Sequence, residues 1–501
     1  MKNKIIFWMD AFLLHYSIAH YMQKKYDAEY YAVFDISNKP KNFFQNQELV
    51  NLKKSWFYHD QIRPNEKPDL EYLSKFEKKY GINLWQLAIN ERIFYRFNDF
   101  YTFSDNEILS ILEQECKFFE SILDEVTPNF IIAEKPVYHH SHLFSEICRA
   151  KNIKSIFIGQ SRLAYKSILS SDPIQLDSIH DFDNIKSKNR NFDELLDILK
   201  SSNVSNQLKT FKKNFTTSRV DKIKAAKEFL LFSQNKNIES HYTYFGRTKS
   251  KVLKHELLSS LKKKYRSKFI DKNLSLEIPN NEKFVYFPLG MDEERNLLIG
   301  APFFTNQIET IRHIAKSLPI NYKLYVKEHY TLSIRDWRKT SDYHEIMEIP
   351  NVKLFHPSVS NNELLKKCSL VITVGGTSGF EAVFYEKPSI IFTNTNYSIL
   401  PSIYKVDSVH ELPSKIKQSL SSKIESSTLD KFLQILEKDS IDFDLYGFMT
   451  KMHEHFYFGG NLADVEITSL SMKNFLQENM TELEYLADAH VVKIKNYQNE
   501  I

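Results

Sequence analysis

Cysteine is scarce in this chain. Its 501 residues include three cysteines, Cys116, Cys148 and Cys368, which lie far apart and form no CxxC pair. Disulfide frameworks and thiolate metal sites both need grouped cysteines. The sequence therefore indicates neither, and we expect the three thiols to be reduced and buried.

Long apolar runs are also missing. No run approaches the ~20 residues that a membrane-spanning helix needs. The opening residues, MKNKIIFWMDAFLLHY, reach Asp10 and His15 too early for a secretory signal. We therefore expect a cytoplasmic protein.

A strong excess of one charge is absent, since the formal net charge is +4. A nearly neutral chain argues against a protein built mainly to hold nucleic acid. The charge is uneven, however, because residues 247–272 carry ten Lys or Arg against Glu256 and Asp271. Such a run is usually a solvated helix face. The alternative is contact with an anionic glycan or an anionic membrane, which would place the protein peripherally on the inner face of the cell membrane.

Strand and helix patterns alternate in two stretches of the chain, which predicts two α/β domains with parallel sheets. In the first stretch, apolar strand patterns cover residues 4–9, 29–36, 129–133 and 155–159. In the second, they cover residues 284–289, 323–326, 352–355 and 370–374. The predicted domains are residues 1–175 and 276–415. Residues 176–275, rich in Lys, Asn, Ser and Asp, are expected to form a helical polar connector or insertion, and residues 416–501 a C-terminal helical region.

A turn of small residues separates two apolar strands in LVITVGGTSGFEAVFYEKPSIIF, residues 370–392. The pair Gly375–Gly376 lets the backbone turn sharply and approach a ligand. Residues Thr377–Gly379 stand where a helix begins, and the free N–H groups and helix dipole there favour a bound phosphate. Glu381 follows one turn later, within reach of a sugar hydroxyl. The spacing is neither a Walker loop nor the dinucleotide pattern, and the same arrangement also occurs without any ligand.

Polar residues follow several other predicted strands, where open α/β sheets bind their ligands. Asp10 and Glu134 do so in the first stretch, and Lys327 and His329 in the second. Asp10 has the alternative role of capping the following helix. Glu134 has the alternative of pairing with Lys135 on the surface. If the two sheets face each other, these residues line one interdomain cleft.

Three histidines, His139, His140 and His142, form the one cluster that suggests a metal site. Their spacing does not place all three on one helical face, and no matching carboxylate or cysteine set is evident. We therefore predict no metal ligands.

The motifs of the second stretch together resemble the capsule polysaccharide biosynthesis family, which includes β-Kdo transferases of bacterial capsules. The resemblance is carried by YFPLGMDEERNLLIGAPFFTNQIETI, KLYVKEH, the strand-end pair Phe355-His356-Pro357, and VITVGGTSGFEAVFYEKPSIIF, in this order over residues 284–393. In the first half, KIIFWMDAFLLHY and PNFIIAE resemble the family more faintly. The chain departs from the family pattern at Tyr330, where Pro is usual, and at Gly290 and Glu293, where His and Pro are usual.

This resemblance implies a GT-B glycosyltransferase with two Rossmann-like domains facing a cleft. Residues 276–415 would hold the nucleotide-sugar donor, with a CMP-sugar such as CMP-Kdo favoured, and residues 1–175 a glycan or glycolipid acceptor. The residues expected to hold the donor and its phosphate are Lys327, His329, Gly376, Thr377, Ser378, Gly379 and Glu381. No metal or other cofactor is required, because these groups can neutralise the leaving phosphate.

The expected catalytic residues are Asp10 and Glu134. One of them would act as general base if the sugar's configuration inverts, or as nucleophile if it is retained. Three other functions stay open: a polyol-phosphate transferase of teichoic-acid type, a nucleotide-sugar 2-epimerase, and a glycan-binding assembly protein without catalysis.

Overall fold

The computed structural model describes residues 2–64, 67–161, 163, 165–201, 219–233, 236–333 and 338–499. The chain forms two compact units that interleave in sequence. Unit 1 comprises Met1–Pro173, Asn206–Val252 and Asp439–Ile501, and unit 2 comprises Ile174–Ser205 and Leu253–Lys438. The residues expected as a connector are thus shared between both units. Of the predicted C-terminal helical region, residues 416–438 belong to unit 2 and Asp439–Ile501 to unit 1.

The sheet of unit 1 has seven strands in the order β13-β6-β5-β4-β1-β2-β3. Their bounds are β1 Asn3–Asp10, β2 Ala28–Asp35, β3 Leu52–Phe57, β4 Phe130–Glu134, β5 Lys154–Gln160, β6 Ser167–Ser170 and β13 Ser440–Ile441. Strands β1 to β5 are parallel, while β6 and β13 are antiparallel additions. The parallel part has the Rossmann order 3-2-1-4-5, so its topological switch point lies between β1 and β4.

Helices cover both faces of this sheet, which explains why its central strands are almost continuously apolar. Ile5, Phe7 and Met9 of β1 face one core, and Ile6 and Trp8 face the other. The first core includes helices α1 Leu14–Met22, α2 Asn38–Asn46, α20 Leu445–Phe456, α21 Ser469–Glu478 and α22 Met480–Asn499. The second includes α4 Leu70–Tyr80, α5 Leu84–Asn90, α6 Asp105–Val126 and α7 His139–Ala150.

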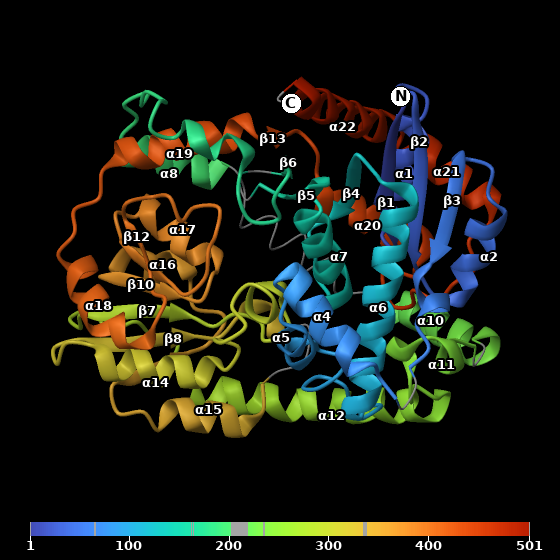
Figure 1. The fold of residues 1–501 in the computed structure, drawn as a ribbon. Helices are drawn as coiled ribbons and strands as arrows, with labels where there is room; N and C mark the ends of the chain where they lie inside the picture. The colour runs from blue at the N-terminus through green and yellow to red at the C-terminus, as the bar shows by residue number, and fades with distance from the viewer. Residues whose placement is uncertain are drawn as a thin grey trace. The chain divides into compact units, whose positions relative to one another are not determined.

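Helices α21 and α22 belong to unit 1 because their apolar faces pack in the same core as its first helix, α1. Helices α1 and α22 lie side by side (Figure 1). The Tyr21 hydroxyl of α1 donates a hydrogen bond of 2.7 Å to the carbonyl of Leu476 in α21. Leu483, Leu486 and Ile494 of α22 are fully buried in the same core. These helices are therefore assigned to unit 1 by the core in which they are buried and not by their position in the sequence.

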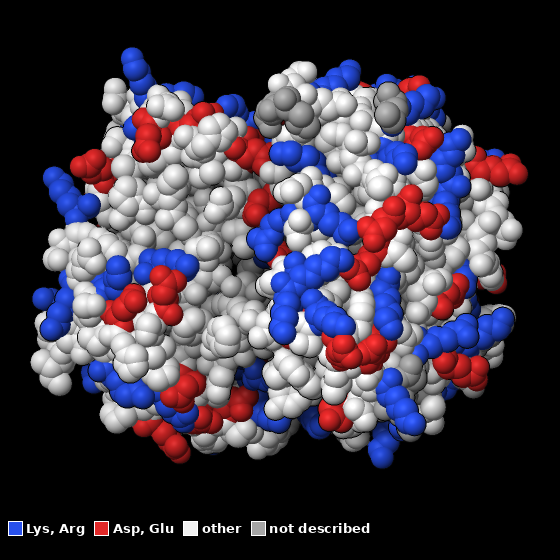
Figure 2. Space-filling view, in the orientation of Figure 1, with Lys and Arg blue, Asp and Glu red and all other residues white. Residues whose placement is uncertain are grey.

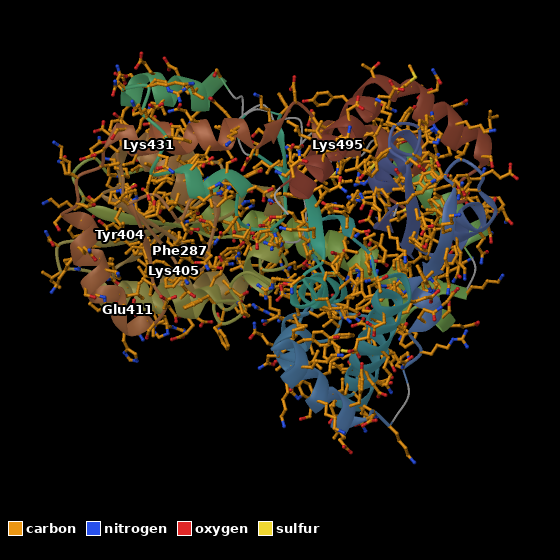
Figure 3. All side chains as sticks on the ribbon, turned by 45° about the horizontal axis from the view of Figure 1, so that its top comes forward. Phe287, Tyr404, Lys405, Glu411, Lys431 and Lys495 are labelled. Atoms are coloured by element: carbon orange, nitrogen blue, oxygen red, sulfur yellow. The ribbon has the colours of Figure 1, made fainter. Side chains whose placement is uncertain are left out.

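The sheet of unit 2 is entirely parallel, with the order β12-β11-β10-β7-β8-β9. Its strands are β7 Phe284–Pro288, β8 Lys323–Lys327, β9 Val352–Phe355, β10 Leu370–Thr373, β11 Ser389–Ile391 and β12 Ile403–Lys405. Numbered along the chain, this is the full Rossmann order 3-2-1-4-5-6, with its switch point between β7 and β10. In Figure 3, Tyr404 and Lys405 mark the edge strand β12 and Phe287 the more central β7.

Two helical layers sandwich the unit 2 sheet (Figure 1). One is formed by α14 Gln307–Ser317, α15 Thr340–Met347 and α18 Leu412–Leu420, and the other by α16 Asn361–Lys367 and α17 Thr377–Phe384. Helices α8 Phe192–Ser201 and α19 Ser426–Lys438 pack against each other. Near them, Arg190 Nε lies 2.5 Å from Asp430 Oδ1. The first part of the predicted polar connector therefore packs as part of unit 2.

The remaining described helices are α3 Tyr58–Gln61, α10 Arg219–Phe232, α11 Lys236–Ser240, α12 Lys249–Asn273 and α13 Arg295–Leu298, with short 3₁₀ turns Asp177–Asp181, Tyr242–Tyr244, Tyr330–Ser333 and Val409–Glu411. The predicted α/β class with two Rossmann-like domains is confirmed by the two strand orders. All three cysteines are free and buried, as expected. Among the described residues, no helix combines the length and apolar character needed to span a membrane.

Candidate active site

The N-terminus of α17 opens at the switch point of the unit 2 sheet. Strand β10 ends at Thr373, and the helix begins at Thr377 after Gly376 as its N-cap residue. Thr373 Oγ1 accepts a hydrogen bond of 3.1 Å from the Gly376 N–H, which shapes the turn. In the described part of the chain, the hydroxyls of Thr377 and Ser378 make no side-chain hydrogen bond and are partly exposed. They are therefore available to an anion at this helix end.

The glycines of this turn are required by close packing. A Cβ on Gly375 would stand 2.5 Å from Thr393 Cγ2, and one on Gly379 would stand 3.0 Å from the Tyr397 hydroxyl. That hydroxyl donates a hydrogen bond of 2.5 Å to the Gly376 carbonyl. None of these glycines has a positive φ. The small residues thus let neighbouring side chains brace the turn from behind.

Lys327 and Glu381 act on each other electrostatically beside this turn. Lys327 is the last residue of β8 and is 7% exposed, and burial lowers the pKa of its ammonium group to about 8 although Glu381 and Glu328 oppose the shift. Glu381 Oε2 accepts a hydrogen bond of 3.1 Å from Asn361, whose own Oδ1 accepts one of 2.6 Å from Tyr286. Tyr286 and Asn361 therefore fix the direction of the Glu381 carboxylate.

His329 is held by the loop that follows β8. Its Nδ1 lies 2.6 Å from Thr331 Oγ1, and the side chain is partly exposed. The intervening Glu328 is buried, and its carboxylate accepts hydrogen bonds from the His329 N–H at 2.6 Å and the Tyr343 hydroxyl at 2.8 Å. Arg338 Nε pairs with the same carboxylate at 3.1 Å. Glu328 is thus a positioning residue, a role that its place after the strand did not reveal.

Asp10 and Glu134 lie at the switch point of unit 1, at the carboxyl ends of the adjacent strands β1 and β4. Burial raises the pKa of both carboxyl groups, and the charge of Asp10 raises that of Glu134 further. Asp10 does not cap a helix starting at Ala11. Its Oδ1 accepts a hydrogen bond of 3.0 Å from the Phe12 N–H, and α1 begins at Leu14 after Leu13 adopts φ 55°.

Four further titratable side chains meet at this edge, and sequence reasoning named only His140 among them, as part of the histidine cluster. Asp35 ends β2 and is paired in register with Asp10. Its carboxylate lies 2.9 Å from His140 Nε2 and 3.1 Å from His59 Nε2. Tyr457, at the end of α20, is buried, and the charge of Asp10 contributes to its raised pKa. The signal for Asp35 was the same as for Asp10, a carboxylate directly at a strand end.

The raised pKa of Glu134 predicts a pH-dependent loss of stability. Its carboxyl ionises near pH 4.3 in the unfolded chain and near pH 8 in the folded one. The folded state binds the extra proton between these values, so stability falls as pH rises through this window, by up to about 1.4 kcal/mol per pH unit. Glu134→Gln should flatten this fall in urea unfolding at pH 4 to 9. The exposed Glu125→Gln serves as control, and equal slopes in wild type and Glu134→Gln would contradict the prediction.

The histidine cluster has carboxylate neighbours that the sequence did not reveal. His139 lies between Glu91 and Glu115, with nitrogen–oxygen distances of 2.9 and 3.0 Å. Both glutamates come from segments far away in the sequence. The argument that no carboxylate set accompanies these histidines was therefore wrong.

Taken separately, each unit is a Rossmann-like sheet with polar groups at its switch point, which defines a two-domain α/β protein. Residues 186–401 match the sequence model of the family described as capsule polysaccharide biosynthesis protein. The match covers β7 to β11 and α17, and confirms the resemblance carried by these motifs. Within these bounds, the chain is similar to the capsule polysaccharide biosynthesis family.

Solved structures give only a distant likeness. The β-Kdo 2,7 transferase KpsC of Thermosulfurimonas dismutans is 11% identical, covers 70% of this chain and 87% of its own, and has a TM-score of 0.30. The UDP-GlcNAc 2-epimerase of Neisseria meningitidis is 10% identical over 87% of this chain and 99% of its own, with a TM-score of 0.27. No curated protein matches the sequence. The fold assignment therefore rests on the strand orders.

Proposed function

We propose that this protein is a glycosyltransferase of capsular or surface polysaccharide biosynthesis that uses a nucleotide-activated sugar. The observation that carries the proposal is the N-terminus of α17, with its two unpaired hydroxyls, opening at the unit 2 switch point beside Lys327. It lies inside the region that matches the capsule family.

Unit 2 has the groups that a leaving nucleotide phosphate needs. Breaking a glycosyl–phosphate bond develops negative charge on the phosphate, which fixed donors stabilise. The proposed donors are the first N–H groups of α17, the hydroxyls of Thr377 and Ser378, Lys327 and His329. Glu381, directed by Asn361, would accept a hydrogen bond from a ribose or sugar hydroxyl. These groups carry the charge without a metal ion or other cofactor.

Unit 1 has the groups that an acceptor hydroxyl needs. A general base works best when its pKa lies near the working pH, and burial moves the carboxyl groups of Asp10 and Glu134 in that direction. One of the pair would remove the acceptor proton, which favours inversion over retention. The neighbouring proton-bearing carboxyl would hydrogen-bond the acceptor. We propose a glycan or glycolipid as acceptor and a CMP-sugar such as CMP-Kdo as donor.

The experiment compares three donors, CMP-Kdo, UDP-GlcNAc and CDP-glycerol, each with and without a glycolipid extract of an encapsulated bacterium. The proposal expects release of CMP from CMP-Kdo that depends on the extract. Conversion of UDP-GlcNAc without extract would indicate an epimerase, and extract-dependent use of CDP-glycerol a polyol-phosphate transferase. Binding of the extract with no turnover of any donor would indicate a glycan-binding assembly protein. Each of these three outcomes contradicts the proposal.

Helix α12 supplies a surface suited to the proposed contact with an anionic membrane. Leu257, Leu261 and Tyr265 recur at four-residue spacing on one helix face and are 65%, 57% and 66% exposed. Exposed lysines flank this ridge, at positions 254, 264 and 268. Over the face drawn in Figure 2, blue and red side chains are interspersed. On that face, charge alone marks no docking surface. An apolar ridge with lysines, by contrast, is typical of interfacial helices.

Leu261→Glu should weaken sedimentation with vesicles that contain phosphatidylglycerol by about tenfold, because it removes apolar contact and adds repulsion. Leu470→Glu is the control, since Leu470 on α21 is also exposed, at 70%. Wild-type binding should also fall with added salt. Binding that is absent, insensitive to salt, or equal in both variants would contradict this membrane surface.

A further inference from the structure

Three buried side chains of unit 1 bring metal-binding atoms together. Glu115 of α6 and His139 and His140 of α7 are 0%, 2% and 3% exposed. One nitrogen or oxygen from each lies within 4.8 Å of the others. His139 Nε2 and Glu115 Oε1 are 3.0 Å apart. Two imidazoles and a carboxylate form a common donor set for zinc.

Each histidine is oriented by a second carboxylate on its other ring nitrogen. His139 Nδ1 lies 2.9 Å from Glu91 Oε2, and His140 Nε2 lies 2.9 Å from Asp35 Oδ2. Metal-ligating histidines almost always have such a partner, which fixes the tautomer and raises the basicity of the ligating nitrogen. This arrangement turns His139 Nε2 and His140 Nδ1 into the candidate ligands.

Two of the candidate ligand atoms have no partner in the described part of the chain. Glu115 Oε2 and His140 Nδ1 are buried and make no hydrogen bond. Buried polar atoms are nearly always satisfied, so such orphans need an explanation. The other oxygen, Glu115 Oε1, accepts hydrogen bonds from the Tyr58 hydroxyl and, at 3.2 Å, from the Tyr242 hydroxyl. A bound cation would satisfy the two orphan atoms together.

We propose that Glu115, His139 and His140 bind a divalent transition metal ion, with Zn²⁺ as the best fit. Donor atoms around a tetrahedral zinc stand about 3.3 Å apart, so a pair at the 4.8 Å limit would close by about 1.5 Å. The ion would tie the start of α7 to α6. Because α7 follows the strand that ends at Glu134, the ion would hold this edge of the sheet in place. The proposal does not depend on glycosyl transfer.

A proton is the alternative occupant. The carboxylates of Glu115 and Glu91 outweigh burial and raise the pKa of His139 to about 10. Without a metal, the carboxylates of the two glutamates favour an imidazolium ion at His139. Zn²⁺ would replace that proton, so binding should release protons into weakly buffered solution.

The test measures metal in the full chain purified from medium supplemented with Zn²⁺, and the visible spectrum of the chelator-treated protein during Co²⁺ titration. We expect about one zinc per chain, a Co²⁺ spectrum with nitrogen ligation, and proton release. His140→Gln should abolish these signals. Asp35→Asn, which leaves all three ligands intact, should weaken Co²⁺ binding about 10–100-fold. His490→Gln, another buried histidine of unit 1, should bind as wild type does.

Substoichiometric zinc together with no Co²⁺ spectrum would overturn the proposal and leave the proton as occupant. Equal binding by wild type, His140→Gln and Asp35→Asn would also overturn it, since the metal would then sit elsewhere. If His140→Gln does not fold, Co²⁺ binding by Asp35→Asn and Glu91→Gln decides whether the metal site exists. Both keep the shape of the site and remove only the charge behind a ligating histidine.

Discussion

Replacing Asp10 with Asn should lower kcat about 10²–10⁴-fold while leaving donor affinity within about twofold of wild type. The amide keeps the shape of the side chain and its oxygen can still accept the hydrogen bond from Phe12. It cannot accept a proton from the acceptor hydroxyl. Glu134→Gln should have the same kind of effect, because burial and the charge of Asp10 raise the proton affinity of the Glu134 carboxyl.

The measurement is steady-state kinetics with varied donor, together with donor binding by calorimetry. Asp27→Asn is the matched control, since its carboxylate lies in the same unit and is 77% exposed. A large loss of donor affinity at unchanged kcat would contradict the assignment. It would mean that Asp10 and Glu134 bind the donor and do not act on the acceptor.

His329→Ala and Ser378→Ala should each weaken donor binding about 10–100-fold, since a hydrogen bond to a charged group contributes ~1.5–3 kcal/mol. His329 stands on the loop after β8 and Ser378 in the first turn of α17. Both would contact the phosphate in the ground state as well as during reaction. The ammonium of Lys327 adds a pH dependence: it loses its charge above pH 8, so donor binding should weaken there.

His410→Ala, which removes an exposed histidine of the same unit, is the control for these variants. Donor dissociation constants and the urea midpoint should be measured for each. If both His329→Ala and Ser378→Ala bind the donor as tightly as wild type, the phosphate site does not lie at this edge of the unit 2 sheet. Retained stability with lost affinity would show that the effect is on binding and not on folding.

The carboxyl ends of the unit 2 strands could be predicted from sequence because the patterns that indicate them are local. The predicted strand over residues 352–355 coincides with β9, and the helix after the small-residue turn begins at Thr377 as expected. Apolar runs bounded by glycine and polar residues report directly on buried parallel strands. Lys327 and Glu381 followed from the rule that ligands bind beyond strand ends.

Features that depend on tertiary contacts could not be predicted. Strand β3, LKKSWF, is an edge strand with two exposed lysines, so it has no continuous apolar pattern. The contact between His139 and Glu115 joins residues 24 positions apart on two helices. The sequence predicts a separate helical region over residues 416–501 because polar faces dominate there, whereas the apolar faces of residues 439–499 complete the core of unit 1.

Thermal unfolding with a panel of nucleotides tests the central claim most directly, because a ligand that binds only the folded state raises its stability. CMP, CDP, UMP, UDP and GDP would be compared at equal concentration with wild type, His329→Ala and His410→Ala. The account predicts that CMP raises the Tm of wild type and of His410→Ala but not of His329→Ala. Absence of any shift with every nucleotide would contradict a nucleotide-sugar transferase.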